Sequence, residues 1–278
     1  MTCILSVSNL CKRYDKFSID DMSFKLMEGT ITGFIGENGA GKTTTLKMLA
    51  GLVKKESGQI TYIDGIKPEN IGFLNGSGDI YPDMKMSSLK KFVSRAYKNT
   101  WNEEKYKYYL SVLFGHAEDK KLKVLSTGMR MKFHLAVELA KQNKVILLDE
   151  PTTGLDPMVR DNVLDILRKI VDEEKRTVLF SSHITEDIEK IADNVLYIDN
   201  GRILLDETKE ALHRDYKMVL KDDIDKLDAS CKDMILKNGV PHFERMIFFS
   251  KDGEMSNDSR IHTASMDDIF VYMKAVKQ

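Results

Sequence analysis

The segment Gly36–Thr43 constrains what this chain can fold into more than any other stretch. Its sequence, Gly-Glu-Asn-Gly-Ala-Gly-Lys-Thr, fits the pattern G-x-x-x-x-G-K-[ST], with an additional glycine at position 39. Glycines let backbone N–H groups approach phosphate oxygens closely, because no Cβ stands in the way. In this pattern Lys42 reaches the β- and γ-phosphates of a nucleotide and the Thr43 hydroxyl binds Mg²⁺. The alternative is an ordinary glycine-rich turn with a chance lysine.

The flanking segments favour the phosphate-binding interpretation. Ile31–Ile35 is apolar and predicts a strand, and the apolar spacing within Thr44–Ala50 predicts a helix. Strand, glycine-rich turn and helix is the order that the motif requires. The helix N-terminus then adds its partial positive charge to the loop.

Composition sets broad limits on the protein. The 278 residues carry a net charge of −1 and contain three cysteines without metal-like spacing, Cys3, Cys11 and Cys231. We expect a reduced cytosolic protein, and the lack of a basic run argues against a nucleic-acid partner. No apolar run approaches the roughly 18 residues of a membrane-spanning helix. Any role at a membrane is therefore expected to come through a partner.

Strands and helices alternate along most of the chain, which predicts a largely parallel, buried sheet. Further strands are expected at 3–8, 19–26, 58–65, 71–74, 177–181, 194–198 and 202–206, with a polar turn at 11–15 and a hairpin turn at Asn200-Gly201. Helices are expected at 87–99, 103–115, 128–141, 161–174 and 185–192. The aromatic residues Phe92, Tyr97, Trp101, Tyr106, Tyr109 and Phe114 are expected to form a small core among the first of these helices. Beyond residue 210 we expect strands at 217–220 and 246–250 and helices at 224–238 and 266–276.

The apolar run Val145–Leu148 ends in two carboxylates, Asp149 and Glu150. Such a run suits a strand that is buried on both faces. Beside a phosphate-binding loop, Asp149 is expected to point at Mg²⁺ and Glu150 to hold the water that attacks the γ-phosphate. The alternative is a strand that simply ends at the surface.

Three further stretches lie around this strand. Pro151–Pro157 follows it directly, and Leu125–Met129 (Leu-Ser-Thr-Gly-Met) places Ser126 and Gly128 at the start of a helix, where N–H groups and a hydroxyl can face an anion. His183 follows an expected strand, at the sheet edge where ligands bind.

Together these motifs resemble, in order and spacing, the ATPases of ATP-binding cassette (ABC) transporters. The resemblance covers about residues 3–210 and rests on 36–43, 125–129, 145–150, 154–157 and His183. It implies a P-loop α/β fold with an ABC-type ATPase core in residues 1–210, comprising an antiparallel β subdomain and a helical subdomain at about 76–141. Residues 211–278 are expected to form a small α+β appendix without a catalytic motif.

The resemblance also implies a site shared by two ATPase subunits that face head to tail. The P-loop of one subunit and Ser126 and Gly128 of the other would hold each ATP, while Asp156 couples the two sites. Tyr14 would stack on adenine, the alternative being an exposed turn tyrosine. The catalytic residues implied are Glu150, His183 and Lys42, with Thr43 and Asp149 at Mg²⁺. The residues that bind ATP would be Tyr14, Asn38, Gly39, Gly41, Lys42, Thr43, Thr44, Ser126, Gly128 and Asp156.

One position departs from the family. The family usually carries a glutamine that touches Mg²⁺ where this chain has Gly76. Either water completes the Mg²⁺ shell or Asn75 substitutes, and water is favoured because a neighbour on an extended chain points away from the position it would replace.

The continuation Gly128-Met129-Arg130-Met131-Lys132 resembles exporter-type ATPases that pair with a separate permease, including bacitracin-type and antimicrobial-peptide exporters. The implied partners are an integral membrane permease and a second ATPase subunit, and the implied location is the cytoplasmic face of the membrane. The alternatives are a soluble ABC ATPase acting on ribosomes or DNA, and a regulatory cassette without turnover. A single P-loop, the absence of heptads and the presence of Glu150 argue against them.

Overall fold

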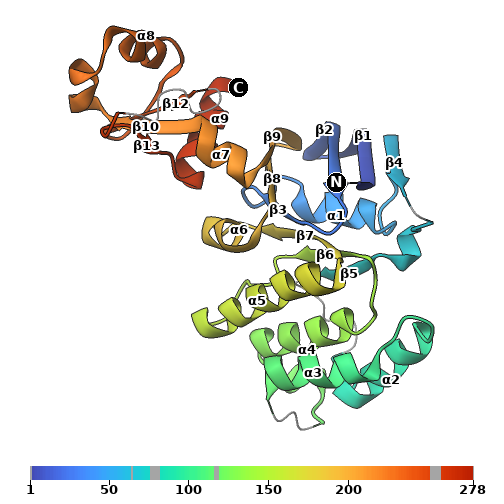
Figure 1. Ribbon diagram of the computed structural model, residues 1–278. Helices are drawn as coiled ribbons and strands as arrows, with labels where there is room; N and C mark the ends of the chain where they lie inside the picture. Colours follow the sequence, from blue (N-terminus) through green and yellow to red (C-terminus); the bar gives the residue numbers. More distant parts are fainter. Residues whose placement is uncertain (1, 64, 76–81, 116–118, 251–257, 278) are drawn as a thin grey trace.

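The computed structural model describes residues 2–63, 65–75, 82–115, 119–250 and 258–277 (Figure 1). The central layer is a six-stranded sheet with the order β5-β6-β7-β3-β8-β9. Its strands are β5 (Gly72–Asn75), β6 (Val145–Asp149), β7 (Thr177–Ser182), β3 (Ile31–Ile35), β8 (Asn194–Asp199) and β9 (Arg202–Thr208). All pairs are parallel except β8–β9, which the expected Asn200-Gly201 turn joins. Both turn residues have positive φ, 45° and 75°, as a tight hairpin turn requires.

Helices and strands cover both faces of this sheet, which explains the unbroken apolar run in β6. On one side Val145 and Leu147 pack with α1 (Lys42–Leu49) and the antiparallel sheet. On the other side Ile146 and Leu148 pack with α4 (Thr127–Leu139), α5 (Pro157–Glu174) and α6 (Thr185–Ile191). Alternate residues of one strand therefore enter two separate cores.

The antiparallel sheet has the order β2-β1-β4, formed by β1 (Cys3–Tyr14), β2 (Phe17–Met27) and β4 (Ser57–Tyr62). The turn expected at 11–15 is wrong, because β1 continues through Tyr14 and the chain reverses after it. The pairing of β1 with β4 ends at Cys11, so the last part of β1 pairs with β2 alone. That arm lies largely outside the core, and its polar residues are compatible with a strand.

The helical part comprises α2 (Met86–Ala96), α3 (Glu103–Phe114) and α4. Tyr106 is buried in its core as expected, but Phe92 is 61% exposed. Val93, four residues after Leu89, packs against this core instead of Phe92. Helix α5 begins at Pro157, earlier than expected, because the Asp156 carboxylate caps it and proline is favoured in a first turn.

Beyond β9 the chain forms α7 (Lys209–Asp215) and a four-stranded sheet of order β11-β12-β10-β13. Its strands are β10 (Tyr216–Leu220), β11 (Val240–His242), β12 (Arg245–Phe249) and β13 (His262–Thr263). The remaining helices are α8 (Ala229–Asn238), which starts later than expected at an Asp228 cap, and α9 (Met266–Lys277). Short 3₁₀ turns lie at Pro68–Asn70, Leu122–Val124 and Lys221–Lys226. Figure 1 shows this sheet and α8 as a lobe beside the central layer. The division at residue 210 stays a prediction.

Candidate nucleotide-binding site

The loop between β3 and α1 has the local geometry that its glycines predict. Gly41, the N-cap of α1, has φ 113°, and a Cβ there would lie 2.7 Å from Phe17 Cζ. At Gly36 a Cβ would lie 2.3 Å from the Ile198 carbonyl oxygen on β8. Glycine is therefore required at both positions, by backbone conformation or by close approach.

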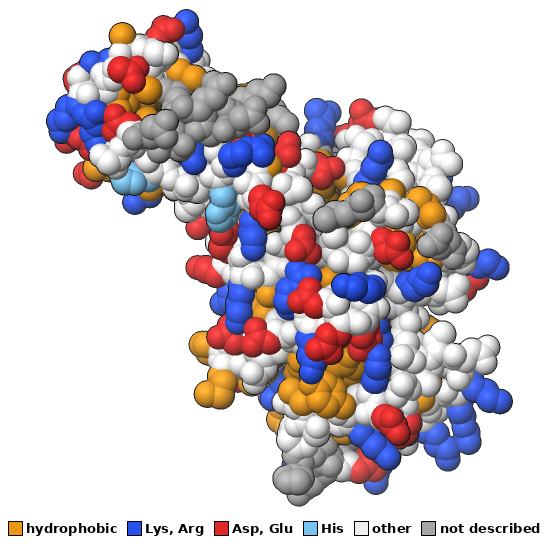
Figure 2. Space-filling model, viewed as in Figure 1, with side chains coloured by type: hydrophobic (Ala, Val, Ile, Leu, Met, Phe, Trp, Pro, Cys, Tyr) orange, Lys and Arg blue, Asp and Glu red, His pale blue; other side chains and the backbone are white. Residues whose placement is uncertain are grey.

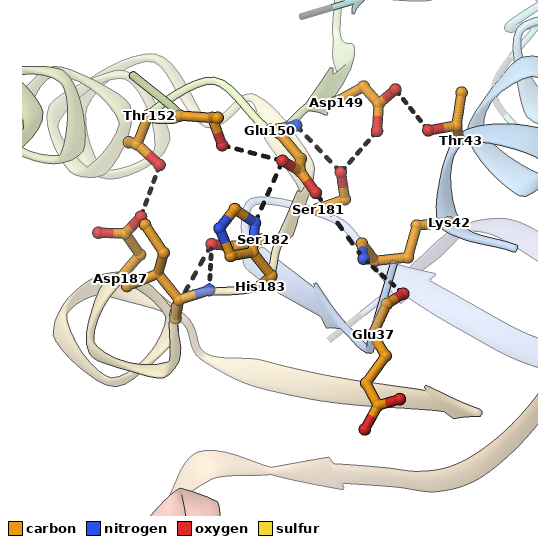
Figure 3. Close-up of polar contacts among 12 residues, drawn as sticks. Glu37, Lys42, Thr43, Asp149, Glu150, Thr152, Ser181, Ser182, His183 and Asp187 are labelled. Carbon is orange, nitrogen blue, oxygen red and sulfur yellow. Dashed lines mark hydrogen bonds and ion pairs between the residues drawn. The ribbon is translucent and has the colours of Figure 1, made fainter. Parts of the chain in front are cut away.

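Lys42 is the central cation of the site (Figure 3). Its Nζ donates to the carbonyl oxygens of Gly36 at 2.6 Å and Glu37 at 3.1 Å, and lies 3.8 Å from Glu150 Oε1. The side chain is buried, and this burial lowers the pKa of Lys42 although Glu150 and Asp149 act in the opposite direction.

Hydrogen bonds link Thr43 in the first turn of α1 to Asp149 and Ser181, which lie at the carboxyl ends of β6 and β7. Thr43 Oγ1 donates to Asp149 Oδ2 at 2.7 Å, and Ser181 Oγ donates to Asp149 Oδ1 at 2.8 Å. Hydroxyl and carboxylate oxygens are the ligands that Mg²⁺ prefers. The pair Thr43–Asp149 therefore fits the metal expected beside the phosphate loop.

Glu150 is held in an unusual backbone conformation, with φ 51°. Left-handed φ is uncommon for residues other than glycine and needs support from its surroundings. The Glu150 N–H donates to Ser181 Oγ at 3.0 Å, and Glu150 Oε2 accepts from Thr153 Oγ1 at 2.9 Å. His183 Nδ1 lies 3.1 Å from the same Oε2, so the carboxylate sits between His183 and Lys42 (Figure 3).

The structure thus brings together five of the residues that the sequence indicated. They are Lys42, Thr43, Asp149, Glu150 and His183. Asn38 and Gly39 lie exposed in the phosphate loop, and Thr44 lies in the first turn of α1.

Tyr14 lies at the end of β1 and is 49% exposed. With Asn200 it lines a surface hollow of about 580 Å³. This hollow adjoins the phosphate loop, because the N–H of Gly201 donates to the carbonyl oxygen of Ala40 at 3.0 Å.

The signature residues lie away from this cluster. Ser126 caps α4, accepting from the Met129 N–H at 3.2 Å, and α4 lies on the opposite face of the central sheet from α1. Gly128 packs against the loop between β6 and α5, since a Cβ at Gly128 would lie 3.3 Å from Leu155 Cδ2. Asp156 caps α5 through the Val159 N–H at 3.1 Å.

Sequence reasoning missed Ser181 and Thr153, which orient the two carboxylates. Ser181 is two residues before His183, so the strand end that indicated His183 could also have indicated Ser181. Gly76 lies outside the described residues. Its neighbour Asn75 is the register partner of Asp149 across β5 and β6.

A parallel sheet with this loop, lysine, threonine and paired carboxylates defines a P-loop ATPase. The model of the ABC transporter family matches residues 19–153. The ABC transporter ATP-binding protein MJ1023 of Methanocaldococcus jannaschii is 30% identical over 271 residues, covering 96% of this chain and 98% of the relative. The chain therefore belongs to the ATP-binding proteins of ABC transporters.

Other relatives and solved structures agree with this assignment. The linearmycin resistance ATP-binding protein LnrL of Bacillus subtilis is 32% identical, covering 75% of this chain and 70% of the relative. The Nod factor export ATP-binding protein I of Ralstonia nicotianae is 32% identical, covering 72% and 66%.

The ATP-binding subunit of an ABC transporter has a TM-score of 0.67 at 23% identity, covering 76% of this chain and 92% of that one. A dimeric ATP-binding cassette with ADP and phosphate has a TM-score of 0.64 at 22% identity, covering 74% and 98%. These structures establish the shared fold, and the family makes the chain the ATPase subunit of a membrane transporter.

Proposed function

We propose that this chain drives an exporter of peptides, antibiotics or other amphipathic compounds. Support comes from the Gly128–Lys132 continuation and from relatives named for linearmycin resistance and Nod factor export. The observation that carries the hydrolytic part is the placement of Glu150 between Lys42 and His183.

In this proposal Glu150 orients the attacking water and accepts its proton, as a general base does. Lys42 leaves the carbonyl oxygens of Gly36 and Glu37 to contact the β- and γ-phosphates. His183 contacts the γ-phosphate. Phosphoryl transfer mainly requires positioning and neutralisation of charge, which these groups supply.

Thr43 and Asp149 would hold Mg²⁺, whose oxygen chemistry their side chains fit. The metal would neutralise the charge that develops on the phosphates. Ser181 would keep the Asp149 carboxylate oriented through its 2.8 Å hydrogen bond.

The site is completed by a second ATPase subunit in this proposal. Ser126 and Gly128 start α4 on the other face of the sheet from α1, so reaching an ATP on the P-loop requires another copy or a related chain. Asn38, Gly39, Gly41 and Thr44 would cradle the phosphates, Tyr14 would stack on adenine, and Asp156 would couple the two sites.

None of the helices formed by the described residues has the length and apolarity of a membrane span. The face seen in Figure 2 intersperses Lys and Arg with Asp and Glu. We place the chain at the cytoplasmic face of the membrane through an integral permease, with residues 1–210 as the ATPase and 211–278 as an appendix.

The test is expression of the tagged chain with the permease that its neighbouring genes encode. We expect both proteins in one detergent-solubilised complex. Cells that carry the native chain should also tolerate a panel of amphipathic compounds better than cells that carry Glu150→Gln. Sedimentation with ribosomes instead of membranes would contradict the proposal. Equal tolerance of cells that carry the native chain and cells that carry Glu150→Gln would also contradict it.

A further inference from the structure

Helix α9 contacts both the phosphate loop and the first residue of α6, which follows His183. Near the start of α9, Asp267 Oδ2 accepts a hydrogen bond from Thr185 Oγ1 at 3.4 Å. Thr185 is the first residue of α6 and lies two positions after His183. Near the end of α9, Lys274 Nζ donates to Glu37 Oε1 at 2.5 Å, within the phosphate loop. The helix therefore reaches from the start of α6 to the phosphate loop.

The part of α9 that carries Lys274 packs on β8. Phe270, one turn earlier, stacks on Tyr197 of β8 with ring centroids 4.4 Å apart and planes 18° apart. The next residue of β8, Ile198, has its carbonyl oxygen against Gly36. Helix α9, β8 and the start of the phosphate loop thus form one packed unit.

Glu37 ties this ion pair to the central lysine of the site. Its carbonyl oxygen accepts from Lys42 Nζ at 3.1 Å, while its carboxylate pairs with Lys274. The hydrogen bond and charge of Lys274 lower the pKa of Glu37. Lys274 Nζ also lies 3.8 Å from Asp199 Oδ1.

ATP brings several negative charges to a loop that already carries the Glu37 carboxylate. Without a cation beside it, this carboxylate would repel the phosphates, because charges within about 8–10 Å are incompletely screened at physiological salt. Lys274 neutralises it and fixes its position.

We propose that Lys274 is a positioning residue for ATP binding, which neutralises Glu37 and holds the phosphate loop from the C-terminal helix. ATP affinity then depends on how α9 docks, so the region beyond residue 210 acts on the nucleotide site. This proposal concerns ATP binding and does not depend on what the transporter moves.

The experiment is a double-variant cycle on the full-length protein. Lys274→Met keeps the apolar stem of the side chain and removes its charge. We measure the Kd for ATP by titration in 50 mM salt. In the native background Lys274→Met should weaken binding about three- to fivefold, the upper part of the range of an exposed ion pair. With Glu37→Gln already present, adding Lys274→Met should change the Kd less than 1.5-fold.

Two further measurements separate positioning from a structural role. The maximal hydrolysis rate at saturating ATP should stay within twofold, so that the loss lies in KM. The loss should also shrink at 500 mM salt, where charges are screened. Lys237→Met is the matched control. Lys237 also forms an ion pair, with Asp233 at 2.6 Å, but both residues belong to α8 and not to the phosphate loop.

An equal loss of affinity in both backgrounds would overturn the proposal, since Lys274 would then act independently of Glu37. No loss in the native background would overturn it as well. Exchanging the two charges, with Glu37→Lys and Lys274→Glu together, should bring the Kd closer to the native value than Lys274→Met does.

Discussion

At the scale of single residues, the site is organised by hydrogen bonds that hold carboxylates in fixed directions. Ser181 donates to Asp149 and accepts from the N–H of Glu150, so one buried hydroxyl orients both acidic residues. The left-handed φ of Glu150 then turns its side chain toward Lys42 and His183. Strained backbone of this kind is common where a catalytic side chain needs a particular direction.

The first prediction concerns Glu150. Glu150→Gln should retain ATP binding, because Lys42 and the phosphate loop are unchanged. Hydrolysis should fall by about 10²–10⁴-fold, the contribution of a general base. ATP should then trap a closed dimer, measured by sedimentation with ATP. Glu104→Gln, an exposed change on α3, is the control. Native turnover by Glu150→Gln would remove this residue from the mechanism.

The second prediction concerns Asn75. It is the register partner of Asp149, and register partners on adjacent parallel strands project from the same face of a sheet. This geometry moves our expectation from water toward the Asn75 carboxamide as the group that replaces the family's glutamine. Asn75→Ala should lower basal hydrolysis about tenfold, as the loss of a group beside a metal does, with little change in ATP affinity. Gly76→Gln should raise hydrolysis.

The control for this prediction is Asn99→Ala, which alters an exposed asparagine after α2. Basal rates are measured with and without the permease. If Asn75→Ala hydrolyses ATP at the native rate, water completes the shell instead.

Much of the site was predictable at this scale because its chemistry is local in the sequence. Gly36–Thr43 and Asp149-Glu150 are contiguous motifs whose residue types match phosphate and Mg²⁺ chemistry. Lys274 was not predictable, because it lies 237 positions from Glu37 and only the docking of α9 brings them together. A lone lysine in an amphipathic helix carries no signal of such a contact.

At the scale of elements, strands buried on both faces were the easiest to predict. The run Val145–Leu148 is apolar throughout because two cores require it to be. The polar end of β1 was wrongly predicted to be a turn. Periodicity indicates which residues are buried, and this part of β1 pairs with β2 alone, outside the core. The β11 and β13 strands were missed because three- and two-residue strands show no period.

The third prediction belongs to the start of α4. Ser126→Arg should leave ATP binding by the P-loop intact, because α4 lies on the other face of the sheet from α1. It should prevent ATP-driven dimerisation through bulk and charge at the proposed shared site, measured by sedimentation with ATP.

The substitution also removes the 3.2 Å cap to the Met129 N–H, which should cost about 1 kcal/mol of stability. Ser126→Asn keeps a capping oxygen and separates this effect from the block of dimerisation. If Ser126→Arg dimerises at the same ATP concentration as the native protein, the site is not shared between subunits.

At the scale of the whole molecule, the C-terminal region shares a core with the ATPase. One cluster of buried residues contains Ile31 and Val178 of the central sheet together with Ile247, Ile269 and Phe270. A boundary near residue 210 therefore cuts through this shared cluster. The region beyond it also has a smaller cluster of its own, formed by Val219, Leu227, Cys231, Ile235, Phe248 and Ile261. Domains that share a core are expected to unfold together.

The last prediction tests this shared core with Phe270→Ala. Phe270 is buried against Tyr197, and removing a buried phenylalanine should cost about 3–5 kcal/mol. The chain has one tryptophan, Trp101, which packs in the helical part beside α2 and α3. Its fluorescence therefore reports unfolding of the helical part, whose hydrophobic cluster does not include Phe270. We expect the urea midpoint of Trp101 fluorescence to fall with the midpoint from circular dichroism.

Phe243→Ala is the control, because Phe243 is 84% exposed and its loss should change stability by less than about 0.5 kcal/mol. In Phe270→Ala, the urea midpoint of Trp101 fluorescence could equal that of the native protein while circular dichroism shows an additional transition at lower urea. This result would show that the C-terminal region unfolds on its own. Coincident midpoints would instead mean that α9 is an integral part of the ATPase, because the free energy lost at Phe270 then appears at Trp101.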